Sequence, residues 1–383
     1  MKITEIKAYL QSNNIDFLFL SHSDPTTFYL LQQNLTGGHL VITSKETILY
    51  HTALDTPNIN STITLKKLGQ HWYESLILNS TISHNNSSNN NPPNINFSNN
   101  PLSNNNHPNN NHPDHNFSNT PKTIALNFNH ITLAQSEFLK KIFPSAEWNN
   151  ITSFLTELRI QKTAEELQQI KHACQITSDA FSALTTFLNT STPTSEQHIA
   201  NFLNTFIQEH NCELSFPTII ASGPNAGTPH HKPTNTFHHG FCVIDFGAKY
   251  QGYCADMTRT IFFGTPTIDE QNLYHLLLEC QIACINHIPN AKTYGDLTSH
   301  AKEKLGMHHE KCTHALGHGI GIEIHEAPCF KENSSILPHT TFTIEPGIYE
   351  QYNYGIRIED TLYWDGTTSQ VLTTAPKELL HFP

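Results

Sequence analysis

The chain of 383 residues is long for one hydrophobic core, so two domains are expected. Its formal net charge is −12 at pH 7 and no stretch is rich in Lys or Arg, which argues against a surface for nucleic acid or an anionic membrane. Charged residues reach only 14% because an Asn-rich stretch dilutes them, and the remaining sequence has the composition of an ordinary folded protein.

Residues 1–150 have the pattern of a small α/β domain. Two β-rich segments, 39–43 and 47–50, are separated by a Ser-Lys-Glu turn and predict a hairpin. Further short elements are expected as a helix at 6–10, a strand at 17–20, a strand at 123–126 and a helix at 138–143.

A tract of Asn, Ser, Pro and His interrupts this domain at about residues 80–121, with Asp114 as its only charged residue. Such a composition cannot bury enough apolar surface to offset the entropy of ordering, which predicts a disordered insertion. The histidines of the tract could bind a metal, but the compositional bias explains them better (His84, His107, His112 and His115).

Residues 151–383 predict an α+β domain, because helices and antiparallel strands occur in separate blocks. Thr163 to Glu166 have the pattern of a capping box, and apolar residues then recur at helical spacing. Further helices are expected after Ser195, around 273–284 and at 294–305, and strands at 241–246, 255–263, 341–345 and 356–362.

The eight cysteines all follow residue 170 and form no Cys-x-x-Cys pair, so a structural zinc site is not indicated. The first residues lack the apolar core of a signal peptide, and no apolar run approaches the ~18 residues that span a membrane. A cytoplasmic protein with reduced thiols and no membrane partner is expected.

Two carboxylates, Asp245 and Asp256, can be placed opposite each other on a hairpin. With a turn centred on Tyr250-Gln251 they become direct cross-strand partners, whose Cβ atoms lie ~5 Å apart on one face of the sheet.

A second pair, Glu345 and Glu359, is opposed in the same way by a turn centred on Tyr352. Pro346 cannot donate to the strand ladder, which makes this second hairpin less regular.

These opposed acids need an explanation, because like charges across a strand pair destabilise it and the neighbouring residues are apolar. A single acid of this kind is more often an ordinary surface charge. Two opposed pairs favour a cation cluster, since a buried carboxylate pair persists only when it is protonated, paired or bound to metal.

One histidine stands out among 26, because His318 is flanked by Gly317 and Gly319 in an apolar run. Glycine on both sides lets backbone and metal approach closely. No Lys-Ser/Thr follows these glycines, so they do not form a phosphate loop.

Several phrases carry a family resemblance: 221–226, Pro229-His230, 245–247, 252–260, 317–321, His325-Glu326, 344–349 and 355–360. In this order and spacing, from about residue 151 to the C-terminus, the sequence resembles the M24 metallopeptidases of pita-bread fold. Within that family it is most similar to the Xaa-Pro peptidases, aminopeptidase P and prolidase. Residues 14–17 and Tyr29-Leu30 resemble the smaller creatinase-type N-terminal domain of α/β class.

The resemblance implies a site with two divalent metal ions. Asp245, Asp256 and Glu359 would hold one ion, while Asp256, His318, Glu345 and Glu359 would hold the other. Four carboxylates and one imidazole suit Mn²⁺ better than zinc, with Co²⁺ and Zn²⁺ as alternatives.

The resemblance also implies residues that act beside the metals. His230 and His325 would contact the substrate and stabilise the tetrahedral intermediate, and Arg357 would orient the neighbouring ligands. His314 aligns with the same group of positions, and Glu345 is the candidate general base. The doublet His230-His231 leaves open which histidine faces the site, and the family pattern favours the first.

The expected activity is hydrolysis of the Xaa-Pro bond at the N-terminus of a peptide, by a homodimer that binds no nucleic acid. Prolidase and aminopeptidase P differ in the substrate length they accept, which the sequence does not show. The alternatives are a methionine aminopeptidase, which shares the ligands, and a non-catalytic binding protein of pita-bread fold.

Overall fold

The computed structural model describes residues 2–59, 62–68 and 121–383. The chain forms two compact units, Met1–Thr152 and Ser153–Pro383. The insertion predicted at about 80–121, with its four histidines, lies outside the described residues except for its last position.

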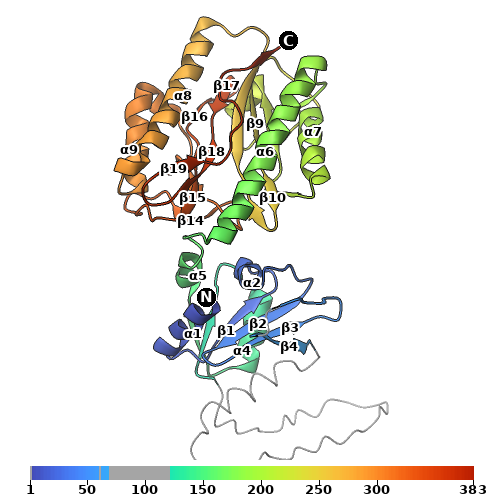
Figure 1. Cartoon of the computed structure of the whole chain (residues 1–383), viewed down its shortest axis with the longest axis vertical. Helices are drawn as coiled ribbons and strands as arrows, with labels where there is room; N and C mark the ends of the chain where they lie inside the picture. The colour runs from blue at the N-terminus through green and yellow to red at the C-terminus, as the bar shows by residue number, and fades with distance from the viewer. Residues whose placement is uncertain (1, 60–61, 69–120) are drawn as a thin grey trace, which may run out of the picture. The chain divides into compact units, whose positions relative to one another are not determined.

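The first unit is built on a six-stranded mixed sheet in the order β4-β3-β2-β1-β5-β6 (Figure 1). Its hairpin pairs Leu40 with Leu49, as the sequence predicts. Buried Phe17, Phe19 and Phe143 contribute to its core. Its elements are α1 Lys2–Ser12, β1 Phe17–Ser21, α2 Pro25–Leu31, β2 Gly38–Thr43, β3 Thr47–His51, β4 Thr64–Lys67, β5 Thr123–Leu126, α4 Leu133–Ile142 and β6 Glu147–Asn150.

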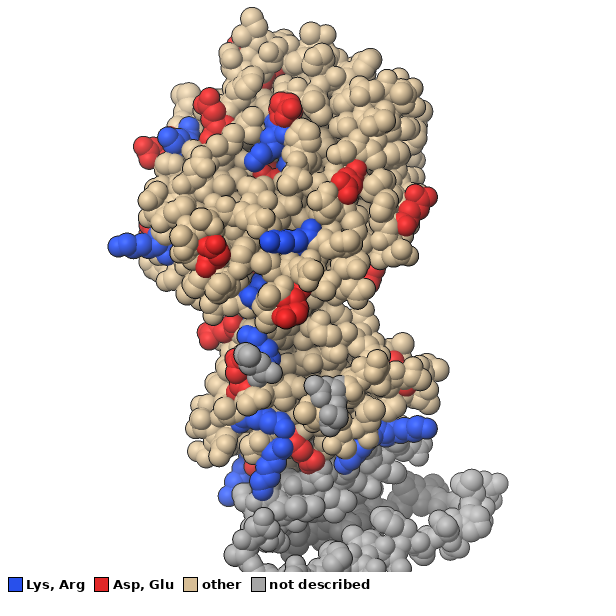
Figure 2. Space-filling model, viewed as in Figure 1, with Lys and Arg blue, Asp and Glu red and all other residues tan. Residues whose placement is uncertain are grey.

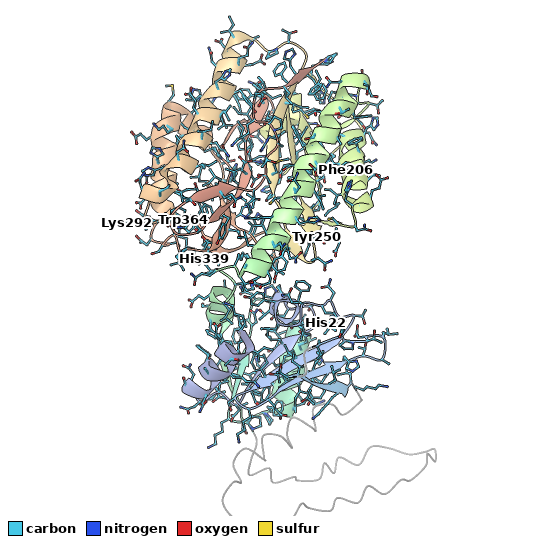
Figure 3. The ribbon with its side chains drawn as sticks, viewed as in Figure 1. His22, Phe206, Tyr250, Lys292, His339 and Trp364 are labelled. Atoms are coloured by element: carbon cyan, nitrogen blue, oxygen red, sulfur yellow. The ribbon has the colours of Figure 1, made fainter. Side chains whose placement is uncertain are left out.

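The second unit has two halves, each with a sheet and a pair of helices (Figure 1). In its first half, the four-stranded sheet has the order β20-β12-β9-β8. Apolar residues of the two helices and the sheet share one core, against which Phe206 and Tyr250 pack (Figure 3). The elements are α5 Thr152–Glu157, α6 Ala164–Thr190, α7 Glu196–Glu209, β8 Ile219–Ser222, β9 Gly240–Phe246, β12 Met257–Phe263 and β20 His381–Phe382.

The second half has a five-stranded sheet in the order β14-β13-β15-β18-β19 and a separate strand pair, β16 and β17. A second core joins these strands to the two helices and includes Trp364 (Figure 3). The elements are α8 Ile268–His287, α9 Tyr294–Leu305, β13 His318–Gly319, β14 Glu326–Cys329, β15 Thr340–Ile344, β16 Gly347–Glu350, β17 Tyr354–Arg357, β18 Asp360–Trp364 and β19 Ser369–Val371.

A small third sheet of the second unit has the strand order β11-β10-β7. It is formed by β7 Glu213–Leu214, β10 Ala248–Tyr250 and β11 Tyr253–Cys254, and three short 3₁₀ helices occupy Gly223–Gly227, Ile288–Asn290 and Gly306–Lys311.

Two helices of the second unit, α6 and α7, begin where their sequences predict, whereas α8 begins at Ile268, before the helix predicted around 273–284. Thr163 caps α6 and forms a reciprocal capping box with Glu166. Ser195 caps α7, and buried Ile199, Leu203 and Ile207 recur at helical spacing along that helix. The mixed α/β architecture confirms the predicted fold class.

Two predicted strands differ from the structure in the second half. The segment predicted at 341–345 ends at Ile344 as β15, and the segment predicted at 356–362 splits into β17 and β18. Both interruptions leave a glutamate outside the strands, Glu345 in one and Glu359 in the other.

Charged side chains are sparse on the surface of the protein. On the face shown in Figure 2, the Lys, Arg, Asp and Glu of the second unit lie singly or in small mixed groups. Among the described residues, no helix is both long and apolar enough to cross a membrane. The eight cysteines, all within the described part of the chain, form no disulfide.

Candidate metal centre

The first pair of acids lies on the Asp hairpin, which we define as residues 240–263. Asp245 is opposite Thr258, not Asp256, so the predicted register is wrong by two residues. The turn consists of Gln251 and Gly252, which have φ angles of 48° and 81° and lie between paired Tyr250 and Tyr253. Because side chains alternate along a strand, a shift of two keeps both aspartates on one face.

The second pair lies on the Glu hairpin, which we define as residues 340–364. Gly347 pairs with Arg357 on one side of the interruption, and Ile344 pairs with Asp360 on the other. The same register continues through the gap, so Glu345 and Glu359 are opposed around Tyr352, as predicted.

His318 lies between two glycines because its neighbours leave no room for side chains. A Cβ on Gly317 would meet the carbonyl oxygen of Thr343 at 2.0 Å, and one on Gly319 would meet Ala327 at 2.4 Å. The Nδ1 atom of His318 lies 3.1 Å from the Gly319 carbonyl oxygen. With Nδ1 as the hydrogen-bond donor, Nε2 carries no hydrogen, and its lone pair can bind a metal ion.

Acidic side chains surround this imidazole. His318 Nε2 is 3.4 Å from Asp256 Oδ2, 3.5 Å from Glu345 Oε1 and 3.9 Å from Glu359 Oε1. Possible ligand atoms of Asp256, His318 and Glu359 all lie within 4.8 Å of one another. The spacing fits a cation between them.

Within the described part of the chain, three buried carboxylate oxygens have no hydrogen-bond partner: Asp245 Oδ1, Asp256 Oδ1 and Glu359 Oε1. Burial, with Asp245 and Glu345 nearby, raises the pKa of Asp256 well above its ordinary value. Burial and the charge of Asp256 do the same to the pKa of Glu359. Buried acids with orphaned oxygens are what a bound divalent cation would satisfy.

Arg357 connects this cluster to the residues around it. It is 4% exposed, and its Nη2 donates to Asp245 Oδ2 at 2.6 Å. Its Nη1 donates to the Tyr349 hydroxyl at 2.6 Å, and its Nε donates to the Thr258 hydroxyl at 3.0 Å. The guanidinium therefore fixes the orientation of Asp245.

His314 and Arg357 both contact the Tyr349 hydroxyl. His314 Nε2 is 2.9 Å from the Tyr349 hydroxyl and His314 Nδ1 is 3.7 Å from Glu345 Oε2. Burial lowers the pKa of His314 below its ordinary value. Because a carbonyl oxygen only accepts, the Nδ1–H of the neutral ring donates to the Ala315 carbonyl oxygen at 2.8 Å, and Nε2 accepts from the Tyr349 hydroxyl.

Three contributors were missed at the sequence level. The Thr258 hydroxyl donates to Glu359 Oε2 at 2.7 Å. The Thr361 hydroxyl donates to the Asp256 carbonyl oxygen at 2.7 Å and accepts from the Asp256 N–H at 3.2 Å. Tyr349 is the third. All three lie within or beside the family phrases, but no local pattern reveals such contacts.

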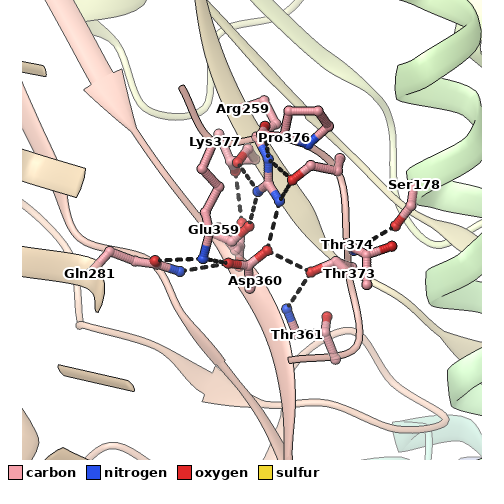
Figure 4. Close-up of polar contacts among 12 residues, drawn as sticks. Ser178, Arg259, Gln281, Glu359, Asp360, Thr361, Thr373, Thr374, Pro376 and Lys377 are labelled. Atoms are coloured by element: carbon pink, nitrogen blue, oxygen red, sulfur yellow. Dashed lines mark hydrogen bonds and ion pairs between the residues drawn. The ribbon is translucent and has the colours of Figure 1, made fainter. Parts of the chain in front are cut away.

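A buried polar network supports Glu359 from behind (Figure 4). Arg259 is 1% exposed and donates to the Glu359 carbonyl oxygen at 2.6 Å and to Asp360 Oδ1 at 2.8 Å. The other oxygen of Asp360 accepts from Lys377 at 2.7 Å and from Gln281 at 2.8 Å. Although burial raises the pKa of Asp360, the two cations hold it below its ordinary value.

A cleft of about 1170 Å³ contains the whole predicted site. His230 and His325 lie on its wall, and the His325 ring packs edge-on against His318 with centroids 4.3 Å apart. His231 also lines the cleft, but its Nε2 bonds Glu196 at 2.8 Å. The cleft brings together all nine predicted positions: Asp245, Asp256, His318, Glu345, Glu359, His230, His314, His325 and Arg357.

The fold and this acidic cleft define a metallopeptidase. The model of metallopeptidase family M24 matches residues 168–365, more than half of the chain, and the protein belongs to that family. This confirms the family resemblance seen in the sequence.

Curated relatives agree with this assignment. An Xaa-Pro dipeptidase of Lactobacillus helveticus is 34% identical over 248 residues, which cover 62% of this chain and 67% of that protein. An uncharacterised peptidase of Bacillus subtilis (strain 168) is 29% identical over 68% of this chain and 75% of its own length. Both relatives are named as peptidases, in agreement with membership of family M24.

Solved structures cover the chain from end to end. An Xaa-Pro dipeptidase from Bacillus anthracis has a TM-score of 0.82 at 24% identity, with 100% of this chain and 99% of that chain covered. The prolidase from Pyrococcus horikoshii OT3 has a TM-score of 0.80 at 25% identity, with 99% of each chain covered. The fold is that of an N-terminal domain followed by a pita-bread domain.

Proposed function

We propose that the protein hydrolyses the bond between an N-terminal residue and proline, using two divalent metal ions. The observation that carries the proposal is the set of three orphaned carboxylate oxygens, of Asp245, Asp256 and Glu359, in the cleft that His318 also lines. The Xaa-Pro dipeptidase of Lactobacillus helveticus, as a relative, supports the proline preference.

The acids and the imidazole fit hard divalent cations. Asp245, Asp256 and Glu359 would hold one ion, and His318 and Glu345 would join the two bridging residues, Asp256 and Glu359, at the other. An oxygen-rich set favours Mn²⁺, with Co²⁺ and Zn²⁺ as alternatives. When bound, the metals would lower the pKa of a water and polarise the scissile carbonyl.

The side chains of the protein do the remaining work. Glu345 accepts the proton of the attacking water, and the His314 imidazole, 3.7 Å from Glu345, contacts the Tyr349 hydroxyl to which Arg357 also donates. His230 and His325 face the cleft, where they donate hydrogen bonds to the substrate. Arg357 keeps Asp245 in place.

One assay separates the possible substrates. Purified protein with Mn²⁺ is offered Ala-Pro, Arg-Pro-Pro and Met-Ala-Ser in parallel. We expect turnover of the proline peptides. Cleavage of Ala-Pro alone identifies a prolidase, and cleavage of Arg-Pro-Pro as well identifies an aminopeptidase P.

The same assay tests the two alternatives. Cleavage of Met-Ala-Ser alone would replace the proposal with a methionine aminopeptidase. No turnover together with weak Mn²⁺ binding in a titration would favour a non-catalytic binding protein. The cytoplasmic location and the homodimer expected from the sequence stay predictions, which cell fractionation and light scattering can test.

A further inference from the structure

Glu196, the first residue of α7, is a buried acid that the proposed mechanism does not use. Glu196 is 0% exposed, and it is not one of the acids that surround His318. Each of its two oxygens accepts three hydrogen bonds. The donors to Oε1 are Ser222 N at 2.7 Å, Ser222 Oγ at 2.9 Å and Asn225 Nδ2 at 3.0 Å; those to Oε2 are His231 Nε2 at 2.8 Å, Thr234 Oγ1 at 2.8 Å and Thr234 N at 3.0 Å.

Four of these six contacts hold the two ends of one loop, residues 225–234, which we name the His230 loop. Oε1 binds Asn225 at the start of the loop and Ser222 at the end of β8 before it, and Oε2 binds His231 and Thr234 at the end of the loop. The backbone N–H of Gln197 adds a bond to the Thr234 carbonyl oxygen at 3.0 Å. The first turn of α7 thereby anchors a segment without regular strand pairing.

The anchored loop meets the candidate metal centre at its middle. The Pro229 carbonyl oxygen accepts from Arg357 Nη1 at 3.5 Å, and Arg357 binds Asp245. The next residue, His230, lines the cleft. A change in the anchor would therefore move a cleft-facing imidazole and loosen one contact of Arg357.

We propose that Glu196 is a positioning residue for catalysis, which fixes the His230 loop so that the His230 imidazole faces the substrate. This inference rests on the proposed function. It requires a carboxylate, because every partner of Glu196 is a donor and only an ionised acid accepts on both oxygens. An amide would turn one donor group toward the donors of Ser222 or Thr234.

The charge state of Glu196 agrees with this role. Burial raises its pKa, but the hydrogen bonds from Asn225, Ser222 and His231 outweigh burial and leave the pKa below its ordinary value of 4.5. A lowered pKa in the folded state means that the acid stabilises the fold above pH 4.5, and that this stabilisation is lost as the pH falls through the folded-state pKa.

The first test is a double-mutant cycle on Ala-Pro hydrolysis with Mn²⁺. We expect Glu196→Gln to lower kcat/KM about 10–100-fold and His230→Ala about 100–1000-fold. If Glu196 acts through His230, the double variant is no slower than His230→Ala alone, within about twofold. Losses that multiply would overturn the inference. Glu209→Gln, an exposed acid at the other end of α7, is the matched control and should keep wild-type activity.

The second test measures hydrogen exchange in the metal-free protein and needs no activity. Glu196→Gln should speed exchange in a peptide that covers residues 222–238 and leave the buried face of α7, residues 199–207, unchanged. Unchanged exchange in the loop would contradict the inference.

His231→Ala removes one of the six contacts, so it tests the same prediction with less risk to folding. It should give a smaller change of the same kind in both measurements, and wild-type behaviour in both would also contradict the inference. Absence of turnover by the wild type would remove the proposed function itself and this inference with it.

Discussion

The Asp hairpin and the Glu hairpin hold their acids in different ways. In the Asp hairpin, Asp245 lies inside the ladder, paired with Thr258 on one side and Ile219 on the other, and only Asp256 lies in a gap, between β11 and β12. Both acids of the Glu hairpin lie where the ladder stops. Their freed backbone N–H groups bond elsewhere: Glu345 to the Leu316 carbonyl oxygen at 2.8 Å and Glu359 to the Thr258 carbonyl oxygen at 3.1 Å.

The difference shows that an interrupted ladder frees backbone N–H groups, which can then form hydrogen bonds to another part of the chain. The Glu359 bond to Thr258 ties the Glu hairpin to the Asp hairpin beside the acids. Since buried N–H groups must be satisfied, the bond also fixes where Glu359 lies. The Glu hairpin therefore depends on the Asp hairpin for its geometry.

Loss of an acid that would contact both proposed metal ions, Asp256 or Glu359, should have the largest effect, and the same effect on either hairpin. We expect Asp256→Ala and Glu359→Ala each to lower kcat/KM by at least about 1000-fold, since several kcal/mol of transition-state stabilisation would be lost. Steady-state kinetics with Mn²⁺ and calorimetric metal titration check this. A tenfold difference between the two variants would show that the hairpins contribute unequally.

Arg357 lies on the Glu hairpin but orients an acid of the Asp hairpin. We expect Arg357→Lys to reduce kcat/KM about 10–100-fold, because one ammonium cannot replace the contacts to Asp245, Tyr349 and Thr258 together. The control is Lys311→Arg, which replaces the partly exposed cation that pairs with Glu350 of the same hairpin. Steady-state kinetics of the two variants are compared. Activity within twofold of wild type would show that Asp245 needs no such support.

Thr361 of the Glu hairpin supports the Asp hairpin, because its hydroxyl bonds both the N–H and the carbonyl oxygen of Asp256. Thr361→Val leaves those groups buried without partners, at a cost of about 2 kcal/mol, which lowers Tm by about 4–8 °C. Thermal unfolding measures this, with exposed Thr367→Val as the control. Equal Tm values for the two variants would contradict the role of Thr361.

The two turns should give the smallest effects, with different signs. Gly252→Ala in the Asp hairpin places a side chain at a φ of 81° and should cost about 1 kcal/mol. Tyr352→Gly in the Glu hairpin removes an 82% exposed residue from a φ of 63° and should leave stability unchanged or raise it by less than about 1 kcal/mol. Denaturant titrations measure the free energy of unfolding of both variants. A lower free energy of unfolding for Tyr352→Gly would contradict the prediction for the Glu hairpin.

The sequence predicts local features of this fold well. Helix starts at Thr163 and Ser195 depend on side chains within three residues of the cap, and both are correct. The Tyr352 turn is also correct, because the register runs unbroken from Ile344 through Tyr354. The Asp hairpin was misplaced because Gln251-Gly252, not Tyr250-Gln251, forms the turn. Glycine at the second position of a two-residue turn is the signal that could have corrected it.

Contacts between distant parts of the chain could not be predicted in this way. Glu196 and Thr234 are 38 positions apart, and Thr361 and Asp256 are 105 apart. No periodicity or spacing relates such residues, since they meet only after several strands have paired. Hairpin spacing indicated the four acids, and the family resemblance completed the nine candidate positions, but neither gave these supporting contacts.

The ion pair between Arg357 and Asp245 spans 112 positions of the chain, which has a consequence for the order of folding. During synthesis the Asp hairpin emerges first, with its two acids close together and their counter-charges still to come. Burying them at that stage is unfavourable, because nothing yet neutralises the charges. The first half of the second unit should therefore close over its acids only after the Glu hairpin arrives, so the centre is among the last parts of the molecule to form.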